Sequence, residues 1–322
     1  MELPLNLSMT DFENDILTGL SSTPKSLPSR YFYDKVGDEL FQQIMKMPEY
    51  YLTNCEFEIF QTKKEEILRL ISPKNEPFNL IEFGAGDGTK TKILLKHFLD
   101  ASAQFEYKPI DISQNAIELL AKDLGQEFPK LSIKGVQGEY FKGLEELNKT
   151  DKAKNVVLFL GSNIGNFTPE RVNSFLCGLN DRLKPGDMIL MGVDLMKDPY
   201  MVLSAYHDAA GITKAFNLNL LHRINQEMDA DFDPMQFDHF PTYNPLTGET
   251  KSFLISQKKQ VVNLRSVGKE IHFSPYEAIQ MEISQKYDLP RLEKMAQASG
   301  FEVVEHLHDC KHYFVDTVWK KK

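Results

Sequence analysis

Asn79-Leu-Ile-Glu-Phe-Gly-Ala-Gly-Asp-Gly-Thr-Lys-Thr91 is the stretch of this 322-residue chain that decides its fold. Its apolar half predicts a buried strand, and a helix is predicted to start at Thr91. Between them stand three glycines in G-x-G-x-G spacing: Gly84, Gly86 and Gly88. A glycine-rich turn between a strand and a helix lets the backbone approach a ligand, because no Cβ intervenes. The alternative interpretation is a strand-to-helix turn without a ligand.

The next predicted strand supplies an acidic residue. Residues 105–110 form an apolar-rich run that ends at Asp111, a little beyond the roughly 20 residues at which a ribose-binding carboxylate is expected. The turn lacks the G-x-G-x-x-G spacing of dinucleotide binders and suits adenosylmethionine, which has a ribose and an amino-acid tail but no pyrophosphate. Asp111 could instead cap a helix, but Ser113 is the better cap for the helix predicted at 116–124.

Further strands alternate with helices along the chain. Strands are predicted at 131–136, 155–160 and 188–193, and Thr168-Pro169 has the pattern of a helix start. This alternation predicts a Rossmann-like α/β fold with a mostly parallel sheet and helices on both faces. Ligands bind such sheets at the carboxyl ends of the strands. The candidate residues at those ends are Gly84–Gly88, Asp111, Glu139, Tyr140 and Asn166, with Glu139 and Tyr140 placed for an adenine edge and face.

Two segments do not follow the alternating pattern. Residues 1–56 predict helices at 11–20, at 34–47 and, from a capping box at Thr53, at 55–71. Residues 199–228 look helical, 229–242 a loop, and 251–256 and 260–264 antiparallel strands. A helix at 290–298 and two runs at 301–306 and 312–319 then return the chain to the sheet, with an antiparallel last strand. We therefore expect a core of residues 57–198 and 284–322, and an α+β substrate-binding domain of residues 1–56 and 199–283.

Composition excludes several classes of protein. The net charge of −9 argues against a nucleic-acid binder, and no apolar run approaches the ~20 residues of a membrane span. The N-terminal Met1-Glu-Leu-Pro lacks the features of a secretory signal. Three widely spaced cysteines, Cys55, Cys177 and Cys310, give no disulfide framework. We expect a cytoplasmic monomer that binds neither nucleic acid nor membrane.

Three other patterns have two interpretations each. The segment His306-Leu-His-Asp-Cys-Lys-His312 resembles a metal cluster, but such tight spacing is unusual for zinc and fits a β-turn, so no metal is expected. Adjacent Tyr50 and Tyr51 fit either core packing or a small-molecule pocket. Glu282 and Ser284 share one face of an extended segment, which is either a solvated edge or part of a site.

Several segments together resemble the histidine-specific Nα-methyltransferase family of ergothioneine biosynthesis. The resemblance runs from about residue 20 to the C-terminus and is far more specific jointly than in any one motif. The segments that carry it are Arg30–Phe41, Pro48–Tyr51, Gly161–Asn166, Asp194–Asp198, Ala205–Gly211, Phe216–Leu221 and Glu282–Ser284.

The resemblance implies a class I methyltransferase core that uses adenosylmethionine to methylate the α-amine of histidine three times, which gives hercynine. It implies that the cofactor is bound by Gly84, Gly86, Lys90, Asp111, Glu139 and Tyr140. It places the amino acid on Tyr50, Asn166, Tyr206, Glu282 and Ser284, with Tyr33, Gly161 and Asn166 near the reacting amine. The packing interpretation of Tyr50 and the edge interpretation of Glu282 are then replaced.

The chain departs from the family pattern at three positions. Glu139 stands where Asp is more common, Asn163 replaces a small Thr, and Ser252 falls where an apolar Met is usual. There are three alternatives to histidine methylation. One is methylation of another amino acid or amine, such as tryptophan. The second is a nicotinamide oxidoreductase, which the glycine spacing disfavours, and the third is a non-catalytic binding subunit, which the intact glycine turn disfavours.

Overall fold

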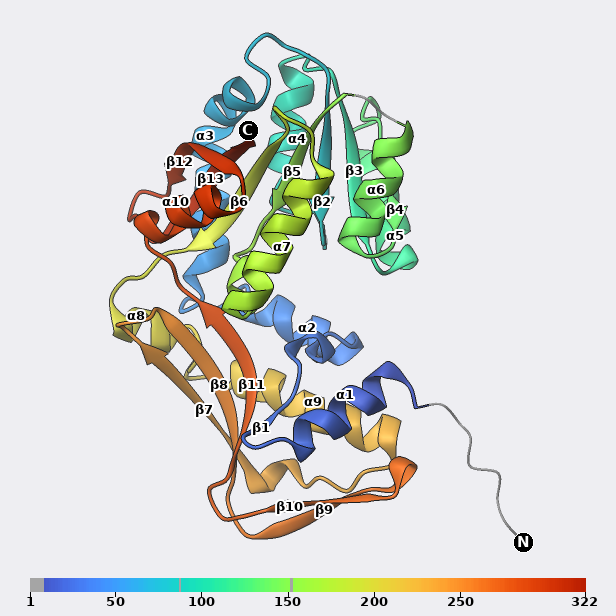
Figure 1. Ribbon diagram of the computed structural model, residues 1–322, viewed down its shortest axis with the longest axis vertical. Helices are drawn as coiled ribbons and strands as arrows, with labels where there is room; N and C mark the ends of the chain where they lie inside the picture. The colour runs from blue at the N-terminus through green and yellow to red at the C-terminus, as the bar shows by residue number, and fades with distance from the viewer. Residues whose placement is uncertain (1–8, 87, 151–152) are drawn as a thin grey trace, which may run out of the picture. The chain divides into compact units, whose positions relative to one another are not determined.

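The computed structural model describes residues 9–86, 88–150 and 153–322, so Asp87 of the glycine-rich turn and the N-terminal Met1-Glu-Leu-Pro lie outside the described part. The chain forms two compact units, each built from two segments (Figure 1). Unit 1 comprises Met1–Tyr51 and Lys197–Ser284, and unit 2 comprises Leu52–Met196 and Gln285–Lys322.

Unit 2 is built on a seven-stranded sheet in the order β12-β13-β6-β5-β2-β3-β4. Its central strands are parallel: β2 pairs with both β3 and β5, and β5 pairs with β6. Strand β13 is antiparallel to both neighbours, β6 and β12, which confirms the predicted antiparallel last strand. The strands are β2 (Phe78–Phe83), β3 (Phe105–Asp111), β4 (Val136–Gln137), β5 (Lys154–Phe159), β6 (Met188–Asp194), β12 (Phe301–His308) and β13 (Phe314–Lys321).

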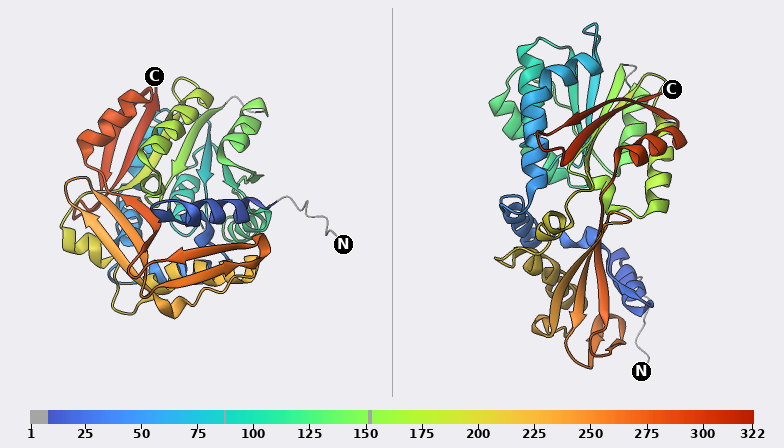
Figure 2. Two further views of the ribbon diagram at one scale, coloured as in Figure 1. Left: turned by 60° about the horizontal axis from the view of Figure 1, so that its bottom comes forward. Right: turned by 90° about the vertical axis from the view of Figure 1, so that its left-hand side faces the viewer.

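Helices cover both faces of this sheet, as predicted. Figure 2 shows α3 and α4 on one face and α7 and α10 on the other. The hydroxyls of Ser113 and Thr168 accept the backbone N–H groups of Ala116 and Arg171, which confirms both predicted caps. The helices of this unit are α3 (Tyr51–Ile71), α4 (Thr91–Asp100), α5 (Gln114–Glu127), α6 (Tyr140–Thr150), α7 (Pro169–Arg182) and α10 (Leu289–Ala298).

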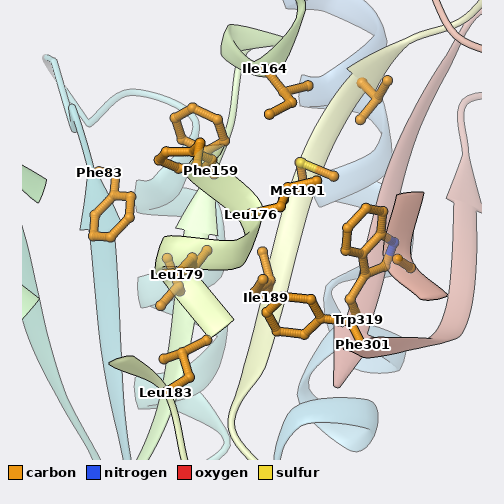
Figure 3. Packing of buried hydrophobic residues seen from close by; sticks show 14 of the residues in the cluster. Phe83, Phe159, Ile164, Leu176, Leu179, Leu183, Ile189, Met191, Phe301 and Trp319 are labelled. Carbon is orange, nitrogen blue, oxygen red and sulfur yellow. The ribbon is translucent and has the colours of Figure 1, made fainter. Parts of the chain in front are cut away.

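Aromatic and aliphatic side chains fill the space between α7, α10 and the sheet (Figure 3). Trp319 of β13 is fully buried beside Phe301, and its indole N–H donates to the Thr317 hydroxyl at 2.8 Å. The indole therefore packs in the core without leaving a polar hydrogen unpaired. Phe83 and Phe159, from the neighbouring strands β2 and β5, belong to the same cluster. The core thus includes the last residues of β2 and β5, the two strands that precede the candidate site.

Unit 1 contains a four-stranded sheet in the order β1-β11-β8-β7 and a two-stranded ribbon of β10 and β9. Helix α9 packs against α2 and against strands β7 and β8. The strands are β1 (Lys25–Ser26), β7 (Phe237–Asn244), β8 (Glu249–Ser256), β9 (Gln260–Leu264), β10 (Lys269–Phe273) and β11 (Ala278–Gln285). The α-helices are α1 (Asp11–Ser21), α2 (Lys35–Ile44), α8 (Pro199–Ser204) and α9 (Ile212–Met228).

Three predictions about secondary structure were wrong. The loop expected at 229–242 contains most of β7, whose Pro241 is tolerated because β7 is an edge strand. Helix α3 starts at Tyr51, so Thr53 lies inside the helix and does not cap it; the buried Leu52 already belongs to the inward face. The strand expected at 131–136 is only β4 and an isolated bridge at Ile133.

Gly37 is predicted to stabilise unit 1, because a larger residue does not fit at its position. It lies in the first turn of α2, where a Cβ would overlap the Phe32 carbonyl oxygen. We expect Gly37→Ala to lower the free energy of unfolding by about 1–3 kcal/mol, measured by urea unfolding. The control is Gly125→Ala in the exposed part of α5, where a Cβ meets nothing within 4 Å and helix propensity should add about 0.5–1 kcal/mol. Equal midpoints for the two variants would contradict this packing.

Candidate active site

The candidate site lies at the carboxyl edge of the parallel strands in unit 2. Strand β2 is central, with β3 on one side and β5 on the other, so the connections after β2 and β5 leave the sheet on either side of a change in strand order. Gly84 follows β2 and Gly161 follows β5. Such a topological switch point is where open α/β sheets bind ligands.

The glycine-rich turn has a backbone that few other residues adopt. Gly84, Gly86 and Gly88 have φ angles of 67°, 56° and 67°, in the left-handed region. A Cβ on Gly84 would lie 2.9 Å from the Tyr140 hydroxyl oxygen, whereas a Cβ on Gly86 would meet nothing within 4 Å. The turn therefore offers an open backbone surface beside a tyrosine hydroxyl, which fits a nucleoside with an amino-acid tail.

Asp111 and Tyr140 lie near the glycine turn. Asp111 ends β3, and its Oδ1 accepts the Ser113 N–H at 2.9 Å. The ring of Tyr140 stacks on Phe83 with 4.6 Å between centroids, so the core occupies one of its faces. Burial raises the pKa of the Tyr140 hydroxyl, and the charge of Asp111 raises it further. The neighbouring Glu139 is exposed and lies 3.3 Å from Lys142 Nζ.

Glu56 lies beside the candidate site, and the sequence interpretation did not include it. It lies on α3, is fully buried, and forms an ion pair with Lys90, the residue before α4. Its Oε1 also accepts the Gly161 N–H at 2.8 Å. Burial disfavours the ammonium form of Lys90, but the adjacent Glu56 outweighs this and raises the Lys90 pKa. One carboxylate thus ties together the segments that follow β2 and β5.

Glu82, on β2 just before the glycine turn, is hydrogen-bonded to two neighbouring elements. Its carboxyl is buried and accepts the hydroxyls of Tyr107 at 2.5 Å and Thr91 at 2.7 Å. Burial raises the pKa of Glu82 to about 7, although both hydrogen bonds act in the opposite direction. Because these hydroxyls come from β3 and from the first turn of α4, Glu82 joins the three elements that surround the turn.

The predicted amino-acid residues are distributed over both units. Asn166 ends the short helix η2 (Asn163–Asn166) of unit 2, and the other four belong to unit 1. Tyr206 is buried at 6% exposure and packs in one cluster with Tyr50 and Tyr51, so the structure brings Tyr50 and Tyr206 together. The Tyr51 hydroxyl accepts a hydrogen bond from Lys197 at 2.8 Å.

Tyr33 lies beside the start of α2. Its ring is 44% exposed and lies 5.5 Å from Phe41 and 5.7 Å from Phe216, between centroids. The next residue, Asp34, caps α2 through the Gly37 N–H and accepts the side-chain amide of Asn219 at 2.8 Å. Asp34 thus attaches the backbone next to Tyr33 to two helices, α2 and α9.

Glu282 and Ser284 lie on β11, as the extended pattern predicted. Glu282 is half-buried and Ser284 is buried at 5% exposure. Ser252 of the neighbouring strand β8 is buried at 1% exposure, and its hydroxyl has no hydrogen-bond partner among the described residues. The polar Ser252 is therefore an interior residue of unit 1.

Possible metal ligands gather at the β12–β13 turn, but the carboxylates there are engaged by backbone groups. In the described part of the chain, Glu58, Asp309 and Cys310 come within ligand distance of one another. Glu58 accepts the Cys310 N–H at 2.8 Å, and Asp309 accepts the N–H groups of Lys311, Tyr313 and Phe314. Both carboxylates therefore stabilise the turn by accepting its backbone N–H groups, which explains their position without a metal ion.

A mostly parallel sheet with an antiparallel last strand, a G-x-G-x-G turn and a carboxylate on the next strand define the class of adenosylmethionine-dependent methyltransferases. Residues 12–321 match the model of the family described as "Histidine-specific methyltransferase, SAM-dependent", and the chain belongs to that family. The family match spans residues of both units.

Three relatives illustrate this membership. The chain is 37% identical over 273 residues to the histidine N-alpha-methyltransferase of Mycolicibacterium smegmatis, covering 85% of this chain and 83% of that protein. It is 34% identical over 273 residues to the protein of the same name from Mycobacterium tuberculosis, with the same coverage. It is 30% identical over 289 residues to ergothioneine biosynthesis protein 1 of Neurospora crassa, covering 87% of this chain and 32% of that protein.

Within the described residues, every helix is too short or too polar to cross a membrane.

Glu82 predicts a dependence of stability on pH. A carboxyl whose pKa is raised in the folded state holds its proton more tightly there, so its contribution is full at low pH and is lost as the pH rises from about 4.5 through about 7. Relative to Glu82→Gln, the wild-type free energy of unfolding should fall by roughly 3 kcal/mol across this window. Urea unfolding of both proteins at several pH values measures this, with the exposed Glu146→Gln as control. Parallel pH curves for wild type and Glu82→Gln would refute the assignment.

Proposed function

We propose that this protein trimethylates the α-amine of L-histidine to hercynine, with adenosylmethionine as methyl donor. The observation that carries the proposal is the switch-point edge of unit 2, where the glycine turn, Asp111, Lys90 and Gly161 lie around one strand end. Membership in the histidine-specific family and the names of the relatives support histidine as substrate. A cytoplasmic, monomeric enzyme is part of the same proposal.

Each part of the cofactor has a proposed contact. The Asp111 carboxylate accepts hydrogen bonds from the two ribose hydroxyls. Glu139 and Tyr140 meet the adenine, Tyr140 with the ring face that Phe83 leaves uncovered. The Lys90 ammonium faces the carboxylate of the amino-acid tail, and Gly84 and Gly86 allow the tail to lie against the backbone.

The substrate amino acid is proposed to be held largely by neutral groups. Asn166 and Tyr206 hydrogen-bond its carboxylate and amine, which avoids a second cation near the sulfonium. Glu282 and Ser284 bind the imidazole, because a carboxylate acceptor and a hydroxyl complement ring nitrogens, and Tyr50 contacts the other ring nitrogen. Tyr33 and the Gly161 carbonyl lie near the reacting amine.

The residues have to position and deprotonate the amine, not create a stronger nucleophile. When bound, adenosylmethionine supplies a methyl group that is transferred as the amine lone pair forms the new C–N bond and the C–S bond electrons return to sulfur. Tyr33 and Gly161 orient the neutral amine for this in-line approach. The amine loses its protons to solvent before or during the successive transfers, and tyrosine rings tolerate the trimethylammonium product by cation–π attraction.

Mass spectrometry of the products tests the proposed reaction. We expect mass increases of one, two and three methyl groups on histidine, with complete conversion to the trimethylated form at excess adenosylmethionine. Tryptophan, the alternative amino-acid substrate, is assayed in parallel. Methylation of tryptophan but not of histidine would replace histidine in the proposal, and methylation of neither would remove the proposed activity.

Glu282→Ala is predicted to lower selectivity for histidine. Loss of a charge-assisted hydrogen bond worth roughly 1.5–3 kcal/mol should reduce kcat/KM for histidine about ten- to a hundredfold and tilt preference toward tryptophan. Affinity for adenosylhomocysteine should stay unchanged. Ser252→Met should sharpen histidine selection or leave it unaltered, and the exposed Glu270→Ala serves as control. A wild-type histidine-to-tryptophan ratio in Glu282→Ala would place the imidazole elsewhere.

A further inference from the structure

A buried group of three ionisable side chains lies behind the glycine turn of unit 2. It consists of Glu56 on α3, Lys90 before α4, and Asp316 on β13. Glu56 and Asp316 are fully buried, and the Lys90 side chain is 22% exposed. A second carboxyl group, that of Asp316, thus lies near the Glu56–Lys90 ion pair in an interior where unpaired charges are costly.

The two oxygens of Glu56 hold different segments. Oε2 forms the ion pair with Lys90, and Oε1 accepts the Gly161 N–H at 2.8 Å. The ammonium in turn lies 3.7 Å from the position that a Cβ on Gly161 would take. Glu56 therefore sets the place of a cation and of a backbone segment on either side of the switch point.

Gly192 makes room for this arrangement. It lies on β6 opposite Asp316 of β13, and a Cβ there would overlap Glu56 Oε1 and lie 3.2 Å from Asp316 Oδ1. Its φ is not in the left-handed region, so the demand for glycine comes from the close approach of the carboxylate. The sheet is thus shaped to admit the Glu56 side chain.

We propose that Glu56 is a positioning residue for the cofactor: it holds the Lys90 ammonium and the Gly161 backbone for the amino-acid tail of adenosylmethionine and neutralises the ammonium. This inference rests on the proposed function, which assigns Lys90 and Gly161 to that site. Adenosylmethionine carries a sulfonium, an ammonium and a carboxylate, so it is a net cation. An uncompensated Lys90 would attract its carboxylate but repel the rest of the molecule.

Asp316 differs from Glu56 in its contacts. Neither of its carboxyl oxygens has a hydrogen-bond partner among the described residues. Burial raises its pKa well above the ordinary value, and the Glu56 charge adds to this while Lys90 opposes it. The buried Glu82 carboxyl also faces Lys90 and Glu56. Burial thus favours the protonated form of Asp316, and Glu56 is the carboxylate in direct contact with the Lys90 ammonium.

The charge argument distinguishes positioning from a merely structural role. Adenosylhomocysteine lacks the sulfonium and is neutral overall, so an unbalanced Lys90 should disfavour adenosylmethionine more strongly. Glu56→Gln keeps the side-chain shape and an acceptor for the Gly161 N–H but removes the charge. Asp316→Asn is its matched control, because it replaces a protonated carboxyl with a neutral group of similar shape.

Calorimetry of adenosylmethionine and adenosylhomocysteine binding to the full chain tests the proposal. We expect Glu56→Gln to weaken adenosylmethionine binding roughly tenfold or more, and adenosylhomocysteine binding at least about threefold less than that. Asp316→Asn should leave both affinities within about twofold of wild type. In a double-mutant cycle with Lys90→Met, the effect of Glu56→Gln should largely disappear. If Glu56→Gln does not fold, Glu56→Asp, which shortens the arm and keeps the charge, should weaken both ligands while preserving their ratio.

Three results would overturn the proposal: unchanged affinities in folded Glu56→Gln, equal losses for the two ligands, or an undiminished effect in the Lys90→Met background. Asp111→Asn separates this proposal from the proposed function, since it should weaken both ligands equally through the ribose they share. If Asp111→Asn weakens both and Glu56→Gln weakens neither, only the positioning role fails. If Asp111→Asn weakens neither, the cofactor binds elsewhere and both proposals fail.

Discussion

The parallel pairing of β2 with β3 on one side and β5 on the other is the constraint on which the candidate site depends. Its register places Phe83 opposite Ile110 and Glu82 opposite Leu158, so the three strands end at one level. Because parallel strands share a direction, the residues that follow them emerge at the same edge. Segments far apart in sequence are brought together there before any side chain contributes specificity.

The same edge contains ionisable side chains that most protein interiors exclude. Glu82 accepts hydrogen bonds from two hydroxyls, Glu56 contacts an ammonium and a backbone N–H, and burial raises the pKa of Asp316. A fourth group, Asp194, forms a fully buried ion pair with Lys286 at 2.8 Å. Buried ion pairs seldom add stability over apolar packing, so this concentration of charge is better explained by ligand binding than by folding.

Local signals made much of unit 2 predictable from sequence. The apolar runs of β2, β3, β5 and β6, the caps Ser113 and Thr168, and the glycines with positive φ all depend on residues close together in the chain. Asp111 and Tyr140 could be located for the same reason, since Asp111 ends β3 and Tyr140 begins α6. The antiparallel last strand was also correctly expected, from the helix–glycine–strand pattern near the end of the chain.

Glu56 could not be found in this way, because its partner Gly161 is 105 residues distant and its place in the pattern after Thr53 suggested a helix cap instead. Gly192 gave no signal either, since its role depends on a carboxylate from another element. In unit 1, β7 was missed because Asp, Phe and Pro suggested a loop, although the alternate residues Phe237, His239 and Pro241 are buried. Sequence patterns do not show such features when they depend on contacts between residues far apart in the chain.

The place of β13 has a consequence for how the chain can be completed. This strand lies between β6 and β12, so residues 314–321 occupy the interior of the sheet, not its edge. Until they have been synthesised, β6 is paired only with β5, and the space filled by Trp319 is vacant. The sheet of unit 2 can therefore be completed only after residues 285–322 have been synthesised. Residues 197–284, which belong to unit 1, are synthesised before them. A nascent chain would expose an apolar strand edge throughout that interval, and unpaired strand edges of this kind favour aggregation.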